Sequence, residues 1–486
     1  MSVADKGAEM GRLSRQWPTY RTVWRWHFFA GAFCVPFVIF LSITGAIYLF
    51  KPQIEGVIDR PFEGLANISE HRLLSEQVQV VLDRYPKAKS IHVELPKEEQ
   101  GATRVMIKDE AKQWRVFVHP KSLEVLSVRD EEYGLMRQVK QLHGQLKAGN
   151  WGSYLVELAA SWTIIMILTG VVLWWPRNAK GIAGVLYPRW GKGARVWWRD
   201  VHSVIGVWVS VFAIFLILTG LPWAKFWGSY FRTVREATGL ASVSQEWTIG
   251  GKEVAKSGAE HSAEHADHAQ HAQHADHAEH SVNRKSAEKG AGGKRGGRPG
   301  AGAPVPKDLS GFDQAIQIAR REKLAYPVLL TPPKSQGLDW TVSSEAQNRV
   351  LRCSLGFDAK TGEVRSREEF ADKHWLDRVV SVGIAAHEGQ LFGGFNQLLG
   401  LLTTLGLIGL ASSGVWMWWI RRDAGGFGIP EPLQQAPLMW AVWLLVALLG
   451  IAMPLFGFSV LIVGLLDWAL RRKGNDPELT SQRRGT

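Results

Sequence analysis

Cysteine is almost absent from this chain, whose 486 residues include only Cys34 and Cys353. Cys34 lies in an apolar stretch and Cys353 in a polar one, so we do not expect the two to meet. Disulfide frameworks and cysteine-based zinc sites need several regularly spaced cysteines. The sequence therefore supports neither kind of site.

Charge is absent from five long segments. No Asp, Glu, Lys or Arg occurs in residues 28–50, 158–175, 203–224, 389–420 and 432–466. About 20 apolar residues span a bilayer as a helix, so these runs predict a polytopic membrane protein. The last run is the longest and contains Pro454. It predicts either one kinked span or a pair of short spans, which leaves five or six spans in total.

Basic residues predominate in the connection between the second and third runs, which carries Arg177, Lys180, Arg189, Lys192, Arg195 and Arg199. Basic residues in short loops mark the cytoplasmic side of a membrane. We therefore expect a cytoplasmic N-terminus and two large external loops, at about 51–140 and 225–385. This placement accounts for the net charge of +12 without a nucleic-acid partner. The first run is not followed by an A-x-A-like cleavage site. We therefore expect it to stay in the protein as a membrane anchor and not to be removed as a signal peptide.

A repeated spacing links four histidines to four glycines, each preceded by Thr or Ser. The offset is 18 residues in two cases and 27 in the other two: His27–Gly45, His202–Gly220, His143–Gly170 and His387–Gly414. Self-similar spacing is the mark of an internal repeat. The sequence thus predicts a unit of span, external module and span that occurs twice.

The two external loops have similar predicted contents. Each begins with helical periodicity and continues with short β-branched and aromatic runs, such as "TRVMIK" and "LDWTVSSE", which indicate strands. Each closes with a hairpin-like element, "VHPKSLEVLSV" in the first and "FDAKTGEVRS" in the second. We expect each loop to hold a small helix-plus-antiparallel-sheet (α+β) module.

The predicted fold class is a polytopic α-helical membrane protein with a duplicated span–module–span unit and one or two C-terminal spans. The expected parts are the N-terminus and span 1 (1–50), module 1 (51–140), an interfacial segment and span 2 (141–176), a basic cytoplasmic loop (177–200), span 3 (201–224), module 2 (225–385) with a low-complexity insert (257–306), an interfacial segment and span 4 (386–422), and the C-terminal span or spans and tail (423–486).

Three motifs carry a resemblance to a known family. They are "WWRDVHSVIG" at the start of the third span, "HEGQLFGG" before the fourth, and "DAKTGEV" closing the second external module. The pattern resembles the PepSY-associated transmembrane family over about residues 17–422, and it is similar to the ferrisiderophore reductases of that family. The resemblance implies PepSY-like external modules, a bacterial inner membrane, periplasmic loops and a ferric siderophore as substrate. "HPKSLEV" in the first module lacks the glycine of the motif.

The four repeated histidines fall at two depths. His27 and His202 start outward-going spans and belong near the cytoplasmic face, whereas His143 and His387 precede inward-going spans and belong near the external face. One metal cannot be shared across about 30 Å of hydrocarbon, so we expect two bis-histidine pairs. Paired neutral imidazoles suit the axial positions of haem iron, and the prediction is two haem b groups. The alternative is that each histidine only lies in the headgroup region.

Glycines accompany these histidines at helical spacing. Gly31 and Gly206 follow His27 and His202 by four residues, one turn along the same face. Gly45 and Gly220 lie further along, near the external end. All four are predicted to clear space for haem. The alternative is that they let helices pack closely.

A low-complexity tract at residues 261–280 contains seven histidines spaced three or four apart. Such spacing allows weak Zn, Cu or Ni binding on one helix face. The alternative is a solvated expansion with incidental metal affinity.

These observations predict a di-haem transmembrane oxidoreductase, a haem-dependent ferric reductase, with no separate catalytic side chain. Electrons pass from the cytoplasmic side or a quinol to a periplasmic ferric chelate. The chain encodes no nucleotide or flavin domain of its own, so the donor is a quinol or a partner reductase. The alternative functions are a PepSY-type regulatory or metal-handling membrane protein without redox activity, and a metal transporter, which the uncharged spans disfavour.

Overall fold

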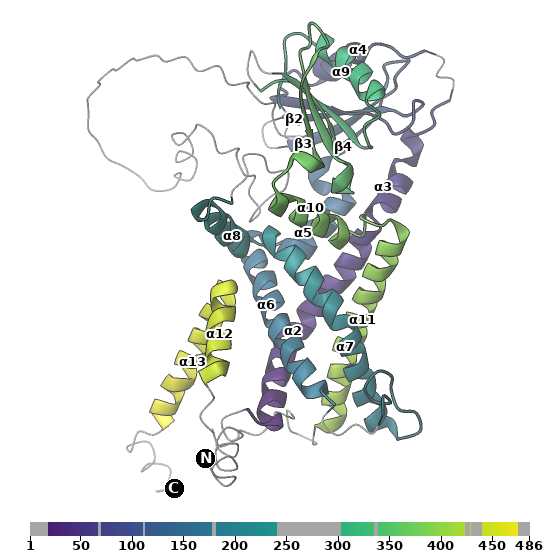
Figure 1. Cartoon of the computed structure of the whole chain (residues 1–486). Coiled ribbons are helices and arrows are strands. Elements are labelled where there is room, and N and C mark those ends of the chain that lie inside the picture. Colours follow the sequence, from purple (N-terminus) through teal and green to yellow (C-terminus); the bar gives the residue numbers. More distant parts are fainter. Residues whose placement is uncertain are drawn as a thin grey trace, which may run out of the picture.

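The computed structural model describes residues 18–66, 70–109, 112–176, 181–240, 303–334, 339–422, 428 and 440–474. It comprises a helical bundle and a separate antiparallel sheet above one end of it (Figure 1). Four helices are long and apolar enough to cross a membrane: α2 (Tyr20–Leu49), α6 (Gly149–Trp174), α7 (Ala194–Gly220, continued by the 3₁₀ turn η3, Leu221–Trp223) and α11 (Gly394–Arg421).

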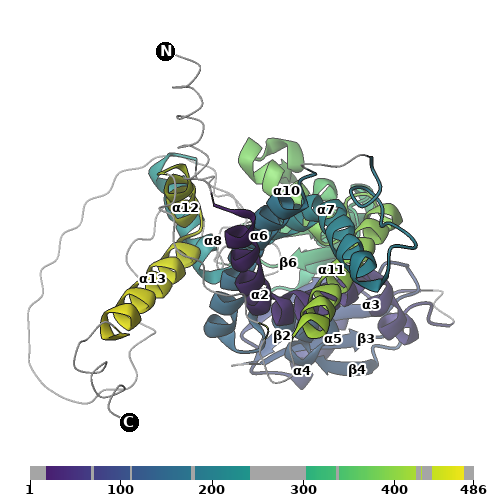
Figure 2. The same ribbon diagram turned by 90° about the horizontal axis from the view of Figure 1, so that it is seen from below.

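The four helices stand side by side around a common centre (Figure 2). Helix α2 packs against α6 and α11, and α7 packs against α11 and α6. The buried positions of α2 and α6 are mostly small, including Ala30, Cys34, Ala159 and Ser161. Small side chains let transmembrane helices approach closely, so the bundle is held by packing between backbones.

The last uncharged run forms two helices, α12 (Trp440–Ala452) and α13 (Pro454–Gly474). They lie against each other, and a Cβ placed on Gly450 would be 3.3 Å from Cα of Gly457. The chain turns at Met453, because Pro454 cannot continue α12. Of the two alternatives left open by the sequence, the structure therefore has the pair of short helices. The start of α12 and the far end of α13 lie at the same end of the molecule (Figure 1).

The strands form one sheet in the order β4-β3-β2-β1-β6-β7-β8-β9, with β5 beside β1. The first set is β1 (Ser90–Glu94), β2 (Thr103–Asp109), β3 (Lys112–Val118) and β4 (Val125–Asp130), and the second is β5 (Ala303–Pro304), β6 (Val328–Thr331), β7 (Trp340–Ser344), β8 (Cys353–Phe357) and β9 (Val364–Glu369). Antiparallel pairing of Val93 with Leu330 joins the two sets. The two expected modules thus share one continuous sheet.

One face of the sheet carries the apolar core. Helices α4 (Leu74–Arg84) and α9 (Ser310–Arg321) cover it on the side away from the bundle (Figure 1). Each contributes apolar side chains to a single buried cluster with the strands, including Val78 from α4 and Phe312 from α9. The two helices also pack on each other, so the sheet and both helices form one α+β unit.

The closing hairpins of the two strand sets use different residues for the same turn. In the second, Asp358 Oδ1 accepts the N–H of Lys360 at 2.7 Å, and Gly362 has a φ of 70°. In the first, His119 Nδ1 accepts the N–H of Lys121 at 3.1 Å, and Leu123 has a φ of 60°. A left-handed leucine is unusual, yet it explains how "HPKSLEV" closes a hairpin without the glycine.

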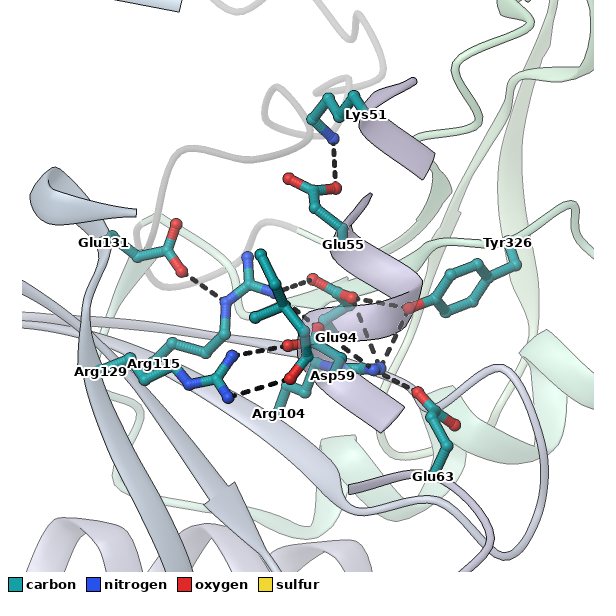
Figure 3. Close-up of polar contacts among 11 residues, drawn as sticks. Lys51, Glu55, Asp59, Glu63, Glu94, Arg104, Arg115, Arg129, Glu131 and Tyr326 are labelled. Atoms are coloured by element: carbon teal, nitrogen blue, oxygen red, sulfur yellow. Dashed lines mark hydrogen bonds and ion pairs between the residues drawn. The ribbon is translucent and has the colours of Figure 1, made fainter. Parts of the chain in front are cut away.

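A charged network fastens the first span to the sheet (Figure 3). Helix α3 (Lys51–Asp59) continues α2 upward, and η1 (Arg60–Phe62) follows it. Asp59 pairs with Arg129 at 2.7 Å, and the buried Arg104 pairs with Glu63 and lies 3.6 Å from Glu94. The hydroxyl of Tyr326, from the second half, donates to Glu94 at 3.0 Å. Burial raises the pKa of Glu94, but Arg115 and Arg104 lower it further, so it lies below its ordinary value.

Candidate functional site

The structure brings the four repeated histidines together as two pairs. His27 on α2 and His202 on α7 have ring centres 6.3 Å apart, with planes at 88°. His143 on α5 (Leu135–Gln145) and His387 on α10 (Trp375–His387) have ring centres 6.5 Å apart, with planes at 79°. Each pair takes one histidine from the first half of the chain and one from the second.

The two pairs lie at opposite ends of the bundle. His27 is near the start of α2, while Gly45, near its end, lies against the ring of His143. The 18 residues between them correspond to about 27 Å of helix. We call His27 and His202 the inner pair, and His143 and His387 the outer pair, which is the one nearer the sheet.

Each histidine Nδ1 forms a hydrogen bond with one hydroxyl. The distances are 3.1 Å for His27–Thr169, 3.0 Å for His143–Thr44, 3.0 Å for His202–Ser413 and 2.9 Å for His387–Thr219. Every one of these hydroxyls also bonds to a carbonyl in the preceding turn of its own helix, to which only the hydroxyl can be the donor. A hydroxyl has one proton, so it accepts from Nδ1–H. Each ring therefore carries its proton on Nδ1, and its Nε2 is a bare lone-pair donor.

A glycine lies against each of the four rings. A Cβ would lie 3.3 Å from Cε1 of His143 at Gly45, 3.1 Å from that of His27 at Gly170, 3.3 Å from that of His387 at Gly220 and 3.4 Å from that of His202 at Gly414. These separations are tighter than the 3.5–4.0 Å optimum for carbon contacts. We call the four dipeptides Thr44-Gly45, Thr169-Gly170, Thr219-Gly220 and Ser413-Gly414 the ligand seats, because the hydroxyl holds a ring and the glycine makes room for it.

The predicted glycines divide into two groups. Gly45 and Gly220 lie at the outer pair, where their contacts are with the histidine rings. Gly31 and Gly206 touch no histidine: a Cβ on Gly31 would be 3.8 Å from Sδ of Met166, and one on Gly206 3.5 Å from Cδ1 of Leu410. These two lie where α2 meets α6 and where α7 meets α11, which is the helix-packing role that the sequence left open.

Sequence reasoning missed half of the ligand seats. Gly170 and Gly414 were noticed only as markers of the repeat, and the four hydroxyls were not considered as partners of the histidines. The signal was present in the constant offsets, because a residue kept at a fixed distance from a repeated histidine is a candidate for contact with it.

The outer pair is neutral at ordinary pH. Burial lowers the pKa of both His143 and His387 to about 4. A neutral imidazole is the form that binds metal. The indole of Trp223 lies edge-on to His387, with ring centres 6.0 Å apart, and it limits access to this pair from one side.

A nearby carboxylate has a structural role. Glu157 of α6 is only 2% exposed, and its Oε2 accepts the N–H groups of Phe226 and Trp227 at 3.1 Å each. These are in the first turn of α8 (Lys225–Ala237). Glu157 therefore caps α8, and the cap explains why a buried charge is tolerated in a membrane helix.

The donor set fits haem. Two imidazoles on opposite sides of one metal, with metal–nitrogen bonds of about 2.0 Å and about 1.2 Å from nitrogen to ring centre, have ring centres about 6.4 Å apart, which matches both pairs. Within the described residues, no group of three or more His, Cys, Asp or Glu side chains is placed to hold a metal. Zinc sites use three or four protein ligands, so two imidazoles match the axial positions of haem better. The histidine tract at 261–280 lies outside the described residues.

Comparison with family models identifies a family for this chain. The family model for the PepSY-associated TM region matches residues 24–421. No curated protein matches the chain. The match begins just before His27 and ends just after Gly414, so all four histidines and all four ligand seats lie within it.

Proposed function

The chain belongs to the PepSY-associated TM family and is a multi-pass membrane protein, and on that premise we propose that it is a di-haem transmembrane oxidoreductase that reduces a ferric chelate. The observation that carries the proposal is the pair of bis-histidine sites at opposite ends of one bundle, each with bare Nε2 atoms. His27 and His202 would hold one haem b, and His143 and His387 a second. Bound haem supplies one-electron transfer, which here would run from the inner pair to the outer pair.

The residues around each pair perform the tasks that such a conduit needs. The seat hydroxyls hold the Nδ1 protons, so that each Nε2 stays available to a metal. The seat glycines let the rings lie close to the neighbouring helix backbone. The uncharged helix surfaces exclude water from the space between the pairs, and this exclusion protects electrons in transit from side reactions.

The proposed orientation follows from charge. The basic loop at 177–200 supports an orientation in which the inner pair lies at the cytoplasmic face. The outer pair and the sheet are then periplasmic in a bacterial inner membrane. The matching strand sets and ligand seats of the two halves support an origin by duplication, with each strand set as one PepSY-like module.

The proposed acceptor is a ferric siderophore, or another ferric chelate, bound between the outer pair and the sheet. One electron converts Fe(III) to Fe(II), which binds hard oxygen ligands less tightly, so the chelate releases its iron. The similarity to ferrisiderophore reductases noted in the sequence supports this acceptor class.

A shallow apolar hollow on the surface of α2 and α11 is relevant to the electron donor. It has a volume of about 330 Å³ and is lined by Ile39, Ser412, Val415, Trp416 and Trp419. Trp416 and Trp419 are exposed on the outer surface of the bundle, so the hollow opens to lipid. Ser412 precedes Ser413, whose hydroxyl holds His202. Such an apolar hollow would suit a quinol dissolved in the bilayer, which we propose as the donor in preference to a water-soluble reductase.

The test is the haem content of the purified protein. An optical spectrum should show two low-spin haem b groups per chain, both oxidised by a ferric siderophore after reduction. Substituting His387→Ala should remove one haem and stop reduction of the external chelate, while the inner haem stays reducible. His71→Ala, which changes an exposed histidine outside both pairs, is the control and should keep both haems. A colourless protein would refute the proposal.

A further inference from the structure

The four ligand seats repeat the same two contacts with their histidine rings. All four hydroxyls meet Nδ1 within 2.9–3.1 Å. A Cβ added to any of the four glycines would lie 3.1–3.4 Å from Cε1 of the neighbouring histidine. Simple burial of a histidine does not need the same two contacts at four separate places.

The helix that carries the hydroxyl decides which atom donates and which accepts in each Nδ1 hydrogen bond. Thr44 donates to the carbonyl of Phe40 at 3.0 Å, and Thr219 donates to that of Phe215 at 2.7 Å. Ser413 donates to the carbonyl of Leu410 at 2.9 Å. Because the single proton is used on the backbone, the hydroxyl oxygen can only accept from the ring. Rotating the hydroxyl to donate to Nδ1 would leave a backbone contact unmade.

Each ligand seat holds a histidine from its own half of the chain, whereas each histidine pair joins one histidine from each half. In the first half, His27 lies on the seat of α6 and His143 on the seat of α2. In the second half, His202 lies on the seat of α11 and His387 on that of α7. Each ligand is therefore oriented by its own half before a cofactor joins the two halves, which is preorganisation of the kind that lowers the cost of binding.

An acceptor at Nδ1 also changes the chemistry of Nε2. Hydrogen bonding from the far ring nitrogen fixes the tautomer and raises the basicity of a metal-ligating histidine. A more basic ligand stabilises ferric over ferrous iron and so lowers the reduction potential, one of the levers by which a protein tunes haem.

We infer that Thr44, Thr169, Thr219 and Ser413 are positioning residues that fix the Nδ1 proton of the four haem ligands and thereby set haem affinity and reduction potential separately at each pair. This inference rests on the proposed function, since it assigns a role toward the cofactor proposed there. The four glycines are the steric part of the same device.

The seats are not identical, and the differences rank the four positions. Backbone carbonyls also act on the other three rings, namely those of Leu41 on His143, Leu410 on His202 and Leu216 on His387. The carbonyl of Met166 forms a full hydrogen bond with His27, at 3.0 Å from Nδ1, so His27 depends least on its hydroxyl. Ser413 lacks the γ-methyl group that restricts the χ1 angle of threonine. Thr44 and Thr219, both at the outer pair, are therefore the positions where loss of the hydroxyl has the largest consequence.

The test compares Thr44→Val and Thr219→Val with Thr163→Val. Valine keeps the shape of threonine and removes the hydroxyl. Thr163 is a buried threonine of α6 that donates to the carbonyl of Ala159 at 2.7 Å and forms no bond with a histidine. In apoprotein titrated with haem, affinity at the outer pair should fall about 10–100-fold in the two seat variants and stay unchanged in Thr163→Val. Spectroelectrochemical titration of the loaded protein should show a higher midpoint potential for the outer haem alone.

Conservative replacement separates the hydrogen bond from packing. Thr44→Ser should restore both the affinity and the potential, and Thr169→Val should have the smallest effect of the hydroxyl deletions. Should Thr44→Val fail to fold, Thr219→Val tests the same pair from the other half. Two haems with unchanged potentials and affinities in the outer-seat variants would overturn this inference and leave the proposed function standing. Absence of haem from the unaltered protein would overturn both.

Discussion

The two halves of the bundle hold their histidines alike but attach to the sheet differently. In the first half, α3 continues α2 into the charged network of Asp59, Arg104 and Arg129 (Figure 3). In the second half, the chain leaves α7 through η3 and turns aside into α8 (Figure 1). There a single buried ion pair, Arg235 with Asp377 at 3.1 Å, joins α8 to α10.

This difference indicates which part of the unit is constrained. The ligand seats match to within a few tenths of an ångström, because each must present one ring at one depth. The connections to the sheet differ in length, charge and direction, because they need only fasten the sheet above the outer pair. The differences between the halves therefore lie at the end of the bundle that carries the sheet, where the proposed function puts recognition of the acceptor.

The largest expected effect is on the network of the first half. Arg104 is 2% exposed and pairs with Glu63, Glu94 and Asp59. Arg104→Met would leave the partly buried Glu63 without its ion-pair partner and remove one of the arginines beside Glu94 and Asp59, at a cost of about 3 kcal/mol, the lower end for breaking a buried pair. Hydrogen exchange of β1 and β2 should accelerate accordingly.

Arg235→Met is the matched change in the second half, because Arg235 is equally buried. It should loosen α8 and α10 and leave exchange in β1 and β2 unchanged. If both variants affect the two regions equally, the halves are not attached independently.

Substituting alanine for glycine should have a smaller effect on stability. The result should differ between the glycines of the ligand seats and those at helix–helix contacts. Gly45→Ala and Gly220→Ala place a Cβ 3.3 Å from an outer ring, and forcing that contact should cost about 1–3 kcal/mol. The outer haem should be lost or show altered absorption.

The helix-contact glycines give the comparison. In Gly31→Ala and Gly206→Ala the new Cβ meets its neighbours at 3.8 and 3.5 Å, so both haems should remain, with stability equal or slightly higher. Loss of the inner haem in these variants would show that the two glycines contact the cofactor after all.

The smallest expected effect is the pH dependence of stability, which should differ between the strands of the two halves. The pKa of Glu94 is below its ordinary value, which is about 4.3, so ionised Glu94 stabilises the fold above that pH. This stability is lost as pH falls from about 4.3 through the lower folded pKa, because the unfolded chain takes up the proton first.

Exchange in β1 should therefore rise below about pH 4.3 while exchange in β8 changes less. Glu94→Gln should reduce the pH dependence in β1. An equal rise in both strands, or a Glu94→Gln protein with the original dependence, would contradict the assignment.

Much of the fold was predictable because its signals are local. The absence of charge marked the four membrane helices, and β-branched runs such as "TRVMIK" lie in the observed strands. Helix α6 begins at Gly149, well before its uncharged run, and includes Glu157, which caps a helix distant in the sequence. The pairing of β1 with β6 was not predicted, since each strand set by itself offers an ordinary sheet edge.

The candidate site shows the same division. The sequence alone determined which histidines repeat and at which end of a span each belongs, because helical rise is constant and converts residue offsets into depth. Tertiary structure decided which glycine meets which ring and which hydroxyl receives each Nδ1 proton. Those contacts depend on how each helix is rotated against its neighbour, and rotation is set by packing between segments about a hundred or more residues apart. Gly31 and Gly45 lie on one helix with similar neighbours in sequence, and only the packed bundle shows that the first meets Met166 and the second His143.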